Sequence, residues 1–255
     1  MEPTMAKYKS FIIHLKRSER RKAQVDDLIS KSPFDAEVVD AVDGRLLSDQ
    51  DINECYKEQL FLRPKYPFGM NSGEIGCFLS HRAAWQRIVD QNLTAGLVFE
   101  DDVQIDPDVF SKNIQAAQAW SKEYGFIQFQ VRGVPEKCKV LDTCGNVQLL
   151  QPSPTLLRCS AQLISRAAAI HLLKETEKFD RPVDGVLQMH WVTGLRPVCV
   201  EPSGVSDRTR ETGGSTLSIK TPKLTKLVRE WQRMVYRRKV VRYSKKSFKP
   251  MVFGD

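Results

Sequence analysis

Apolar residues along the first 205 positions form short bounded runs that alternate with longer segments of helical periodicity. A run of four to eight apolar residues between turn residues indicates a buried strand. Such runs lie at residues 8–15, 34–42, 96–99, 126–131, 156–164 and 196–202, and a hairpin is predicted through 147–152. Between them, residues 73–91 place their apolar side chains on one face of a helix, and further helices are predicted from Pro107 to about Trp120 and after Ser165.

Strands that alternate with helices predict an α/β fold, with a mixed, mostly parallel sheet flanked by helices. In such folds, ligands bind at the carboxyl ends of the strands. Three consecutive acids, Glu100, Asp101 and Asp102, directly follow the apolar run 96–99. The sequence therefore places a carboxylate cluster at the sheet edge where a ligand is expected.

The last 36 residues differ from the rest in charge. The whole chain has a net charge of +8, but residues 220–255 hold 12 lysines and arginines against two acids, a net of +10. Residues 1–219 hold 27 basic and 29 acidic side chains, a net of −2. We therefore predict two parts, a globular domain over 1–219 and a basic tail over 220–255.

The tail also has a regular apolar stripe. Leu224, Leu227, Val228, Trp231, Met234 and Val235 recur at helical spacing. An amphipathic helix with a basic polar face is suited to an anionic membrane surface. Docking on the body is the second interpretation. The stripe argues against a purely electrostatic nucleic-acid arm, so no nucleic-acid partner is expected.

Several classes of protein are not expected. No apolar run approaches the roughly 18 residues that a transmembrane helix needs, and the apolar core at residues 11–15 is too short for a signal peptide. Six cysteines without a C-x-x-C pair predict neither a disulfide framework nor a zinc site. We expect a reduced, cytoplasmic protein.

The three acids have two interpretations. Mg²⁺ and Mn²⁺ prefer carboxylate oxygens, and Mg²⁺ is commonly held by one or two carboxylates and the phosphates of a substrate. A solvated turn after a strand would place acids in the same way. These residues alone leave both interpretations open.

Four segments read together carry a resemblance. "FIIHLKRSERR", "VVDAVDGR", "GEIGCFLSHRAAWQRIV" and "GLVFEDDV" occur in this order, and "SAQLISRAAAIHLL" and "RPVDGVL" follow. Over roughly residues 8–205 the chain resembles glycosyltransferase family 25, the bacterial lipopolysaccharide sugar transferases related to procollagen galactosyltransferases. The Gly-Glu-Ile-Gly-Cys…Ser-His segment before Glu-Asp-Asp is the most specific part.

The resemblance implies a GT-A-type, Rossmann-related fold, a UDP-hexose donor (most often UDP-galactose), Mn²⁺ or Mg²⁺, and inversion at the anomeric carbon. Glu100-x-Asp102 would stand in the place of the Asp-x-Asp motif. Asp102 would be the main metal ligand, and Glu100 or Asp101 would contact the donor ribose or metal-bound water. Asp101 is also a candidate metal ligand, and His190 would complete the metal shell as a histidine does in some GT-A enzymes.

Inverting transfer needs a base for the acceptor hydroxyl, which contributes on the order of 10² to 10⁴ in rate. Asp184 in "RPVDGVL" is our candidate, with a helix N-cap as the alternative. Arg17, Arg20 or Arg21 could bind the diphosphate, with a solvated helical turn as the alternative. Asp43 is a candidate for the base or ribose, with a turn role as the alternative. His81 is a candidate for the donor pocket, with a core histidine as the alternative.

These predictions combine into one functional hypothesis. The chain would transfer a hexose, with a β-linkage, from a UDP-sugar to a lipid-linked oligosaccharide of lipopolysaccharide or lipooligosaccharide type. It would lie peripherally on the inner face of the bacterial inner membrane. A catalytically silent relative that binds a nucleotide or glycan, and a membrane-binding protein acting through its tail, are the competing hypotheses. The sequence predicts no oligomeric state.

Overall fold

The computed structural model describes residues 6–58, 60, 62–136, 138–211 and 223–246. The strands are β1 (Tyr8–His14), β2 (Ala36–Asp40), β3 (Ala95–Glu100), β4 (Val103–Ile105), β5 (Phe126–Phe129), β6 (Lys139–Cys144), β7 (Val147–Gln151), β8 (Ala161–Ser165), β9 (Val198–Glu201) and β10 (Val205–Asp207). The α-helices are α1 (Lys22–Lys31), α2 (Asp49–Cys55), α3 (Ser72–Asp90), α4 (Pro107–Tyr124), α5 (Arg166–Glu175), α6 (Val183–Leu187), α7 (His190–Thr193) and α8 (Lys223–Ser244), and two 3₁₀ turns are η1 (Glu19–Arg21) and η2 (Gly44–Leu46).

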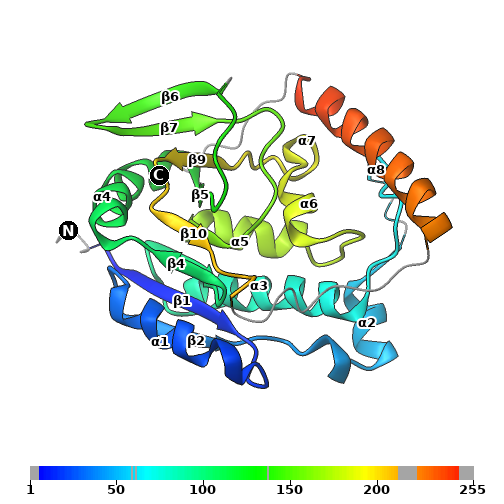
Figure 1. Ribbon diagram of the computed structural model, residues 1–255, viewed down its shortest axis with the longest axis horizontal. Coiled ribbons are helices and arrows are strands. Elements are labelled where there is room, and N and C mark those ends of the chain that lie inside the picture. Colours follow the sequence, from blue (N-terminus) through cyan, green and yellow to red (C-terminus); the bar gives the residue numbers. More distant parts are fainter. Residues whose placement is uncertain (1–5, 59, 61, 137, 212–222, 247–255) are drawn as a thin grey trace.

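The described residues form an eight-stranded sheet in the order β2-β1-β3-β8-β5-β9-β7-β6, and β10 pairs with β4 in a small second sheet (Figure 1). Strands β1, β2 and β3 are parallel to one another, as are β5 and β9. Strand β8 runs antiparallel to β3 and β5, and β7 runs antiparallel to β9 and β6. The predicted α/β fold with a mixed sheet is confirmed.

Both faces of the central strands are buried, and successive side chains of such a strand belong to two different cores. In β3, Leu97 and Phe99 join a cluster with residues of α1 and α4, whereas Val98 joins a cluster with residues of α3, α5 and α6. Period-2 alternation sends successive side chains to opposite faces. A strand covered on both sides is therefore apolar throughout, as the run before Glu100 is.

The predicted helix of residues 73–91 is α3, and its start is set by side-chain capping. Asn71 accepts from the backbone N–H of Glu74, and the Glu74 carboxylate accepts from that of Asn71. Gly76 lets the helix approach η2, because a Cβ there would lie 2.5 Å from the carbonyl oxygen of Val42. This close contact places the loop containing Asp43 beside the N-terminal turns of α3.

Helix α8 packs on the body through one face. The phenol oxygen of Tyr236 accepts a hydrogen bond from Arg181 at 2.9 Å, and the ring of Tyr243 stacks on Trp191 with centroids 5.6 Å apart. Val240 is buried on the same face. Docking on the body, one of the two interpretations of the tail, is therefore observed (Figure 1).

The docked face is not the apolar stripe read from the sequence. Leu227, Val228 and Trp231 are 77%, 59% and 62% exposed, and Met234 is 41% exposed. Contact with the body uses residues on the opposite side of the helix. The predicted boundary at 219/220 and the side chain of Leu224 lie outside what the structure describes. Among the described helices, none is both long and apolar enough to cross a membrane.

Candidate active site

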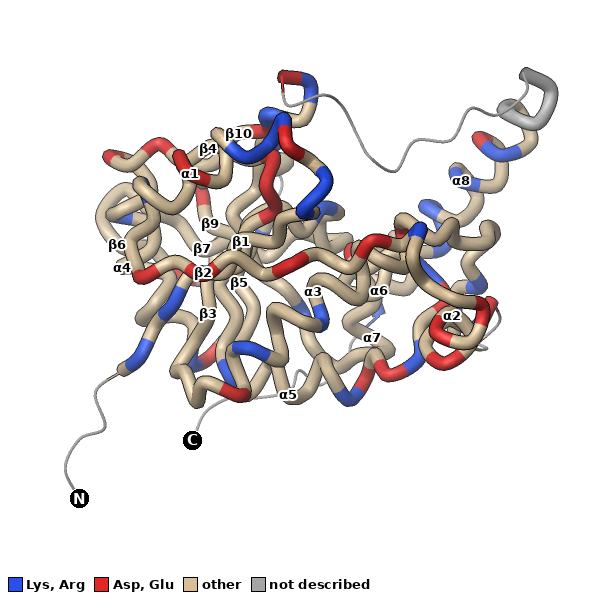
Figure 2. Tube along the Cα trace, turned by 90° about the horizontal axis from the view of Figure 1, so that it is seen from below, with Lys and Arg blue, Asp and Glu red and all other residues tan. Residues whose placement is uncertain are grey.

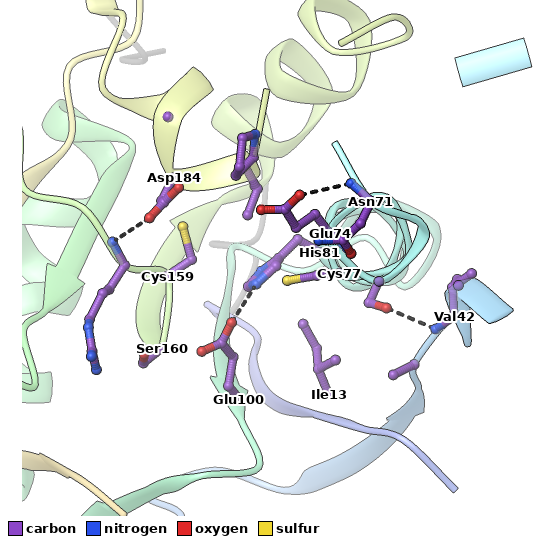
Figure 3. A pocket seen from close by; sticks show the side chains of 18 of the residues that line it. Ile13, Val42, Asn71, Glu74, Cys77, His81, Glu100, Cys159, Ser160 and Asp184 are labelled. Carbon is purple, nitrogen blue, oxygen red and sulfur yellow. Dashed lines mark hydrogen bonds and ion pairs between the residues drawn. The ribbon is translucent and has the colours of Figure 1, made fainter. Parts of the chain in front are cut away.

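A cavity of about 750 Å³ lies at the carboxyl ends of β1 and β3. Its walls come from segments far apart in the chain: the strand ends, the loop around Asp43, the first turns of α3, residues 157–160, the start of α6 and one face of α8. Figure 3 shows Glu100, His81, Cys77 and Asp184 facing this space. A cavity is therefore present at the sheet edge where the sequence predicts a ligand.

Asp101 of the acidic triple is held by neighbouring side chains. Its Oδ2 lies 2.7 Å from the Nδ1 of His14, and its Oδ1 accepts from the guanidinium of Arg21. Asp101 and Arg21 are both buried, and their pairing compensates the burial of the two charges. Asp101 thus ties η1 to the end of β3, and both of its oxygens already have partners.

Asp102 is the more available acid. Its Oδ2 accepts from the hydroxyl of Thr209 at 3.1 Å and lies 3.3 Å from a guanidinium nitrogen of Arg21. Burial and the neighbouring charge of Glu100 raise the pKa of Asp102 from 3.8 to about 6. Ionisation of Asp102 is thus costly beside Glu100, and a bound cation would stabilise the ionised form.

Glu100 lies at the end of β3 and lines the cavity with a side chain that is 29% exposed. Its Oε1 lies 3.3 Å from the Nε2 of His81. Burial opposes ionisation of Glu100, but the hydrogen bonds from His81 and Ser160 and the charges of His81 and Arg21 together lower the pKa of the carboxyl. His81, predicted for the donor pocket, is 1% exposed and lines the cavity.

Asp184 also lines the cavity, from the first turn of α6. The helix starts at Val183 with Pro182 as its N-cap, so the predicted N-cap position of Asp184 is wrong by two residues. Its Oδ2 accepts from the backbone N–H of Arg158 at 3.2 Å, and burial together with the charge of Glu100 raises the pKa of Asp184. Arg158 adopts a φ of 82°, so local backbone strain accompanies this contact.

The predicted basic residues separate into two groups. Arg17 lines the cavity and donates from Nε to Oδ2 of Asp43 at 2.6 Å, while Arg20 is exposed and lies outside the lining residues. The turn η1 directs Arg21 inward instead, to the acids. Asp43 lines the cavity, and its pKa is lowered by hydrogen bonds from Arg45 and Arg17.

His190, predicted to complete a metal shell, is not among the residues that line the cavity. It is fully buried in α7, where burial and the charge of Arg196 lower its pKa to about 4. A neutral, enclosed histidine of this kind contributes to packing around α7. The structure therefore does not bring His190 together with Glu100, Asp101 and Asp102.

Most of the chain matches one known family. The model of "Glycosyltransferase family 25 (LPS biosynthesis protein)" matches residues 7–187, well over half of the chain. The chain belongs to glycosyltransferase family 25. The predicted resemblance is therefore confirmed. The matched residues include every cavity residue discussed above except Thr209. The cavity residues of α8 also lie outside the match.

Curated relatives of this family 25 chain match it over part of its length. Human procollagen galactosyltransferase 2 is 34% identical over 137 residues, which are 50% of this chain and 22% of that protein. The rat "probable inactive glycosyltransferase 25 family member 3" is 36% identical over 107 residues, 41% of this chain and 18% of that protein. The chain thus spans about a fifth of the length of these relatives.

Among solved structures, a mannose-1-phosphate geranyltransferase from Thermus thermophilus aligns with 67% of this chain and 54% of its own at 8% identity. The TM-score of 0.30 is too low to carry an argument about this family 25 chain.

Sequence reasoning missed three contributions to the family 25 cavity. Tyr236 and two arginines of α8 line it, although the tail was treated as a separate part. Cys77 lines it from α3, although the pattern of the six cysteines predicted no ligand site. Thr209, which bonds Asp102, follows the last predicted strand and carried no recognisable signal.

Proposed function

We propose that this chain is a metal-dependent hexosyltransferase that uses a UDP-sugar donor. The observation that carries the proposal is the convergence of Glu100, Asp102 and Asp184 on one cavity at the carboxyl ends of β1 and β3. Arginines of the rim, among them Arg17 and Arg158, face the same space and suit a diphosphate. Galactose is the proposed hexose because a curated relative is named a procollagen galactosyltransferase.

The oxygens of Asp102 and Glu100 fit a hard divalent cation, Mn²⁺ or Mg²⁺. Asp101 is a weaker candidate ligand, because Arg21 and His14 occupy its oxygens. When bound, the cation would stabilise the negative charge that develops on the leaving UDP. The raised pKa of Asp102 supports this assignment, since a nearby positive charge would favour its ionised form.

Asp184 is proposed as the general base. It would take the proton of the acceptor hydroxyl while that oxygen attacks the anomeric carbon, which gives inversion and a β-linkage. Its raised pKa makes it a stronger base than an ordinary aspartate, and the Arg158 N–H holds its Oδ2 in place. Asp184 lies on a different element from the acids of β3, so the acceptor and the donor could approach from different walls.

The proposed acceptor is a lipid-linked oligosaccharide of lipopolysaccharide type, taken from the inner face of a bacterial inner membrane. The outer face of α8 supports this location. Leu227, Trp231 and Met234, and then Arg238, Arg242 and Lys245, follow one another at spacings of three or four residues, and all six are exposed. An apolar half followed by a basic half suits insertion at an anionic lipid surface.

The two faces of α8 would have different roles, one in lining the cavity and the other in binding the membrane. Arg233, Tyr236 and Arg237 line the cavity, while the exposed stripe points to the other side of the helix. Figure 2 shows the basic residues spread along α8 beside the body. A membrane bound to the outer face would thus lie next to the cavity that receives the acceptor.

The decisive experiment measures UDP release by the purified chain from UDP-galactose and UDP-glucose, with Mn²⁺ and after chelation. We expect turnover of UDP-galactose only with metal, and its loss in Asp102→Asn. Asp108→Asn is the matched control, because Asp108 is exposed in the first turn of α4 and outside the cavity. Metal-dependent UDP binding without turnover would instead favour the catalytically silent hypothesis, which the name of the rat relative raises.

A further inference from the structure

A cluster of three different ligand types lies on the α3 side of the cavity. Cys77 and His81 are four residues apart on α3 and so lie on the same face of the helix, and Glu100 reaches them from the end of β3. The Sγ atom, a ring nitrogen and a carboxylate oxygen all lie within 4.8 Å of one another. Figure 3 shows Cys77 and His81 projecting from the helix toward Glu100.

We propose that Cys77, His81 and Glu100 form a second metal site that takes a borderline-soft ion such as Zn²⁺. Sulfur, imidazole nitrogen and carboxylate oxygen are the ligands that Zn²⁺ uses in proteins. Mg²⁺ and Mn²⁺ prefer sites made of oxygen alone. This site therefore differs in ligand chemistry from the oxygens proposed for the catalytic cation at Asp102.

The second ring nitrogen of His81 has a partner suited to this role. The side-chain amide of Gln162 on β8 lies 3.0 Å from Nδ1, and Gln162 is fully buried. When the amide nitrogen donates, Nδ1 accepts, and the carbonyl oxygen Oε1 of Gln162 has no hydrogen-bond partner among the described residues. With the amide turned, Oε1 accepts from Nδ1–H, and Nε2 presents its lone pair to an ion. Ligating histidines are typically oriented by such a carbonyl.

The three ligand atoms would have to move only slightly closer to one another to bind one ion. Bond lengths of about 2.0 to 2.3 Å place the ligands of a tetrahedral zinc ion about 3.3 to 3.8 Å apart. The glutamate side chain is partly exposed and can rotate to close the difference from 4.8 Å. Three protein ligands leave a fourth position open toward the cavity, where water or an oxygen of a substrate could bind.

The negative charges around Cys77 favour the binding of a cation there. Burial and the negative charges of Glu100, Asp184, Asp102 and Glu74 disfavour the thiolate of Cys77 and raise its pKa. The same charges attract a divalent ion, which displaces the thiol proton to solvent when it binds. An ion here would also engage Glu100. On the proposed function, Zn²⁺ would therefore inhibit transfer by removing a carboxylate from the donor site.

Titration of the metal-free protein with Co²⁺, a spectroscopic substitute for Zn²⁺, tests the site without any sugar nucleotide. We expect a thiolate-to-cobalt charge-transfer band that appears with Co²⁺ and disappears when Zn²⁺ is added. Cys77→Ala and Cys77→Ser should both lose the band. Gln162→Leu should weaken Co²⁺ binding by about 10- to 100-fold, as expected for a residue that orients a ligand.

Two matched variants serve as controls. Cys159→Ala removes the other cysteine that lines the cavity, and Asp102→Asn removes the proposed oxygen ligand of the catalytic cation; both should keep the band. Absence of the band from the wild-type protein, or its persistence in both Cys77 variants with native circular dichroism, would overturn the proposal. Failure of UDP-galactose turnover with the cobalt band intact would instead count against the proposed function alone.

Discussion

Tyr236 of α8 and Arg181, three residues before Asp184, are joined by a hydrogen bond of 2.9 Å from the guanidinium to the phenol oxygen. Arg181 is fully buried and also pairs with Asp180 and donates to the carbonyl oxygen of Pro64. The tail helix and the segment of the proposed base are therefore held by the same guanidinium. Removal of either partner should affect the body and the tail together.

Tyr236→Phe should lower the free energy of unfolding by about 1 kcal/mol, because one hydrogen bond is lost and the ring remains. Arg181→Met should cost more, on the order of 3 to 5 kcal/mol, because Asp180 is left buried without its partner. Urea unfolding followed by circular dichroism measures both. Tyr243→Phe is the matched control, since its ring still stacks on Trp191. Equal effects of Tyr236→Phe and Arg181→Met would contradict this account.

Asp101→Asn should destabilise the fold by on the order of 3 kcal/mol, since it leaves the buried guanidinium of Arg21 without its main carboxylate. The loss should be visible as a lower urea midpoint at neutral pH. Asp102→Asn changes the adjacent acid in the same way but should not lower the midpoint. A neutral outcome for Asp101→Asn would show that the ion pair is not a structural requirement.

Asp102 should make the protein less stable as the pH rises through the range from about 4 to 6. Its pKa is about 6 in the folded chain and 3.8 ordinarily, so between these values the folded state binds more protons than the unfolded state. The cost is absent below about pH 4 and complete above about pH 6, at roughly 3 kcal/mol. The free energies of unfolding of wild type and Asp102→Asn at pH 4, 5, 7 and 8 measure this cost. Their difference should grow up to about pH 6 and be the same at pH 7 and 8. Mn²⁺ should reduce that difference.

Asp184→Asn should lower the turnover of UDP-galactose with an acceptor by about 10² to 10⁴, because the acceptor hydroxyl loses its base. UDP binding should change little, since Asp184 is proposed to act on the acceptor. Isothermal titration with UDP and Mn²⁺ is the control measurement. Unchanged transfer in Asp184→Asn would remove this residue from the mechanism and leave the family assignment intact.

Trp231→Glu with Met234→Glu should reduce cosedimentation with vesicles containing phosphatidylglycerol by at least about tenfold, because burial of two large apolar side chains is lost. Val140→Glu is the matched control: Val140 is 49% exposed on β6, outside α8 and the cavity. The release of UDP in the absence of vesicles should be the same in all three proteins. Vesicle binding that survives the double substitution would contradict the membrane role of α8.

Local sequence signals were sufficient for the long strands and helices of the body and for part of the site, but not for the short elements β4, β10 and α7. The alternating cores of the sheet make strands such as 95–100 apolar throughout, so the acids that follow stand out at the strand end. The capping pairs of α2 and α3 are likewise local, since Ser48 with Asp51 and Asn71 with Glu74 lie three residues apart. Local signals could not show that Arg20 is exposed and Arg21 is buried, because the direction of each side chain depends on how the 3₁₀ turn η1 packs against the strand ends.

The sequence by itself determined the α/β class and the position of Glu100, Asp101 and Asp102 at a sheet edge, because these depend on local periodicity and spacing. It also indicated the family, through the resemblance of its ordered motifs. Only the tertiary structure decided that Asp102 is more available to a ligand than Asp101. His14 of β1 and Arg21 of η1 both contact the Asp101 carboxylate. The tertiary structure also joined Cys77 to Glu100 and placed α8 on the cavity wall. These are contacts between residues far apart in the chain, and no periodicity encodes them.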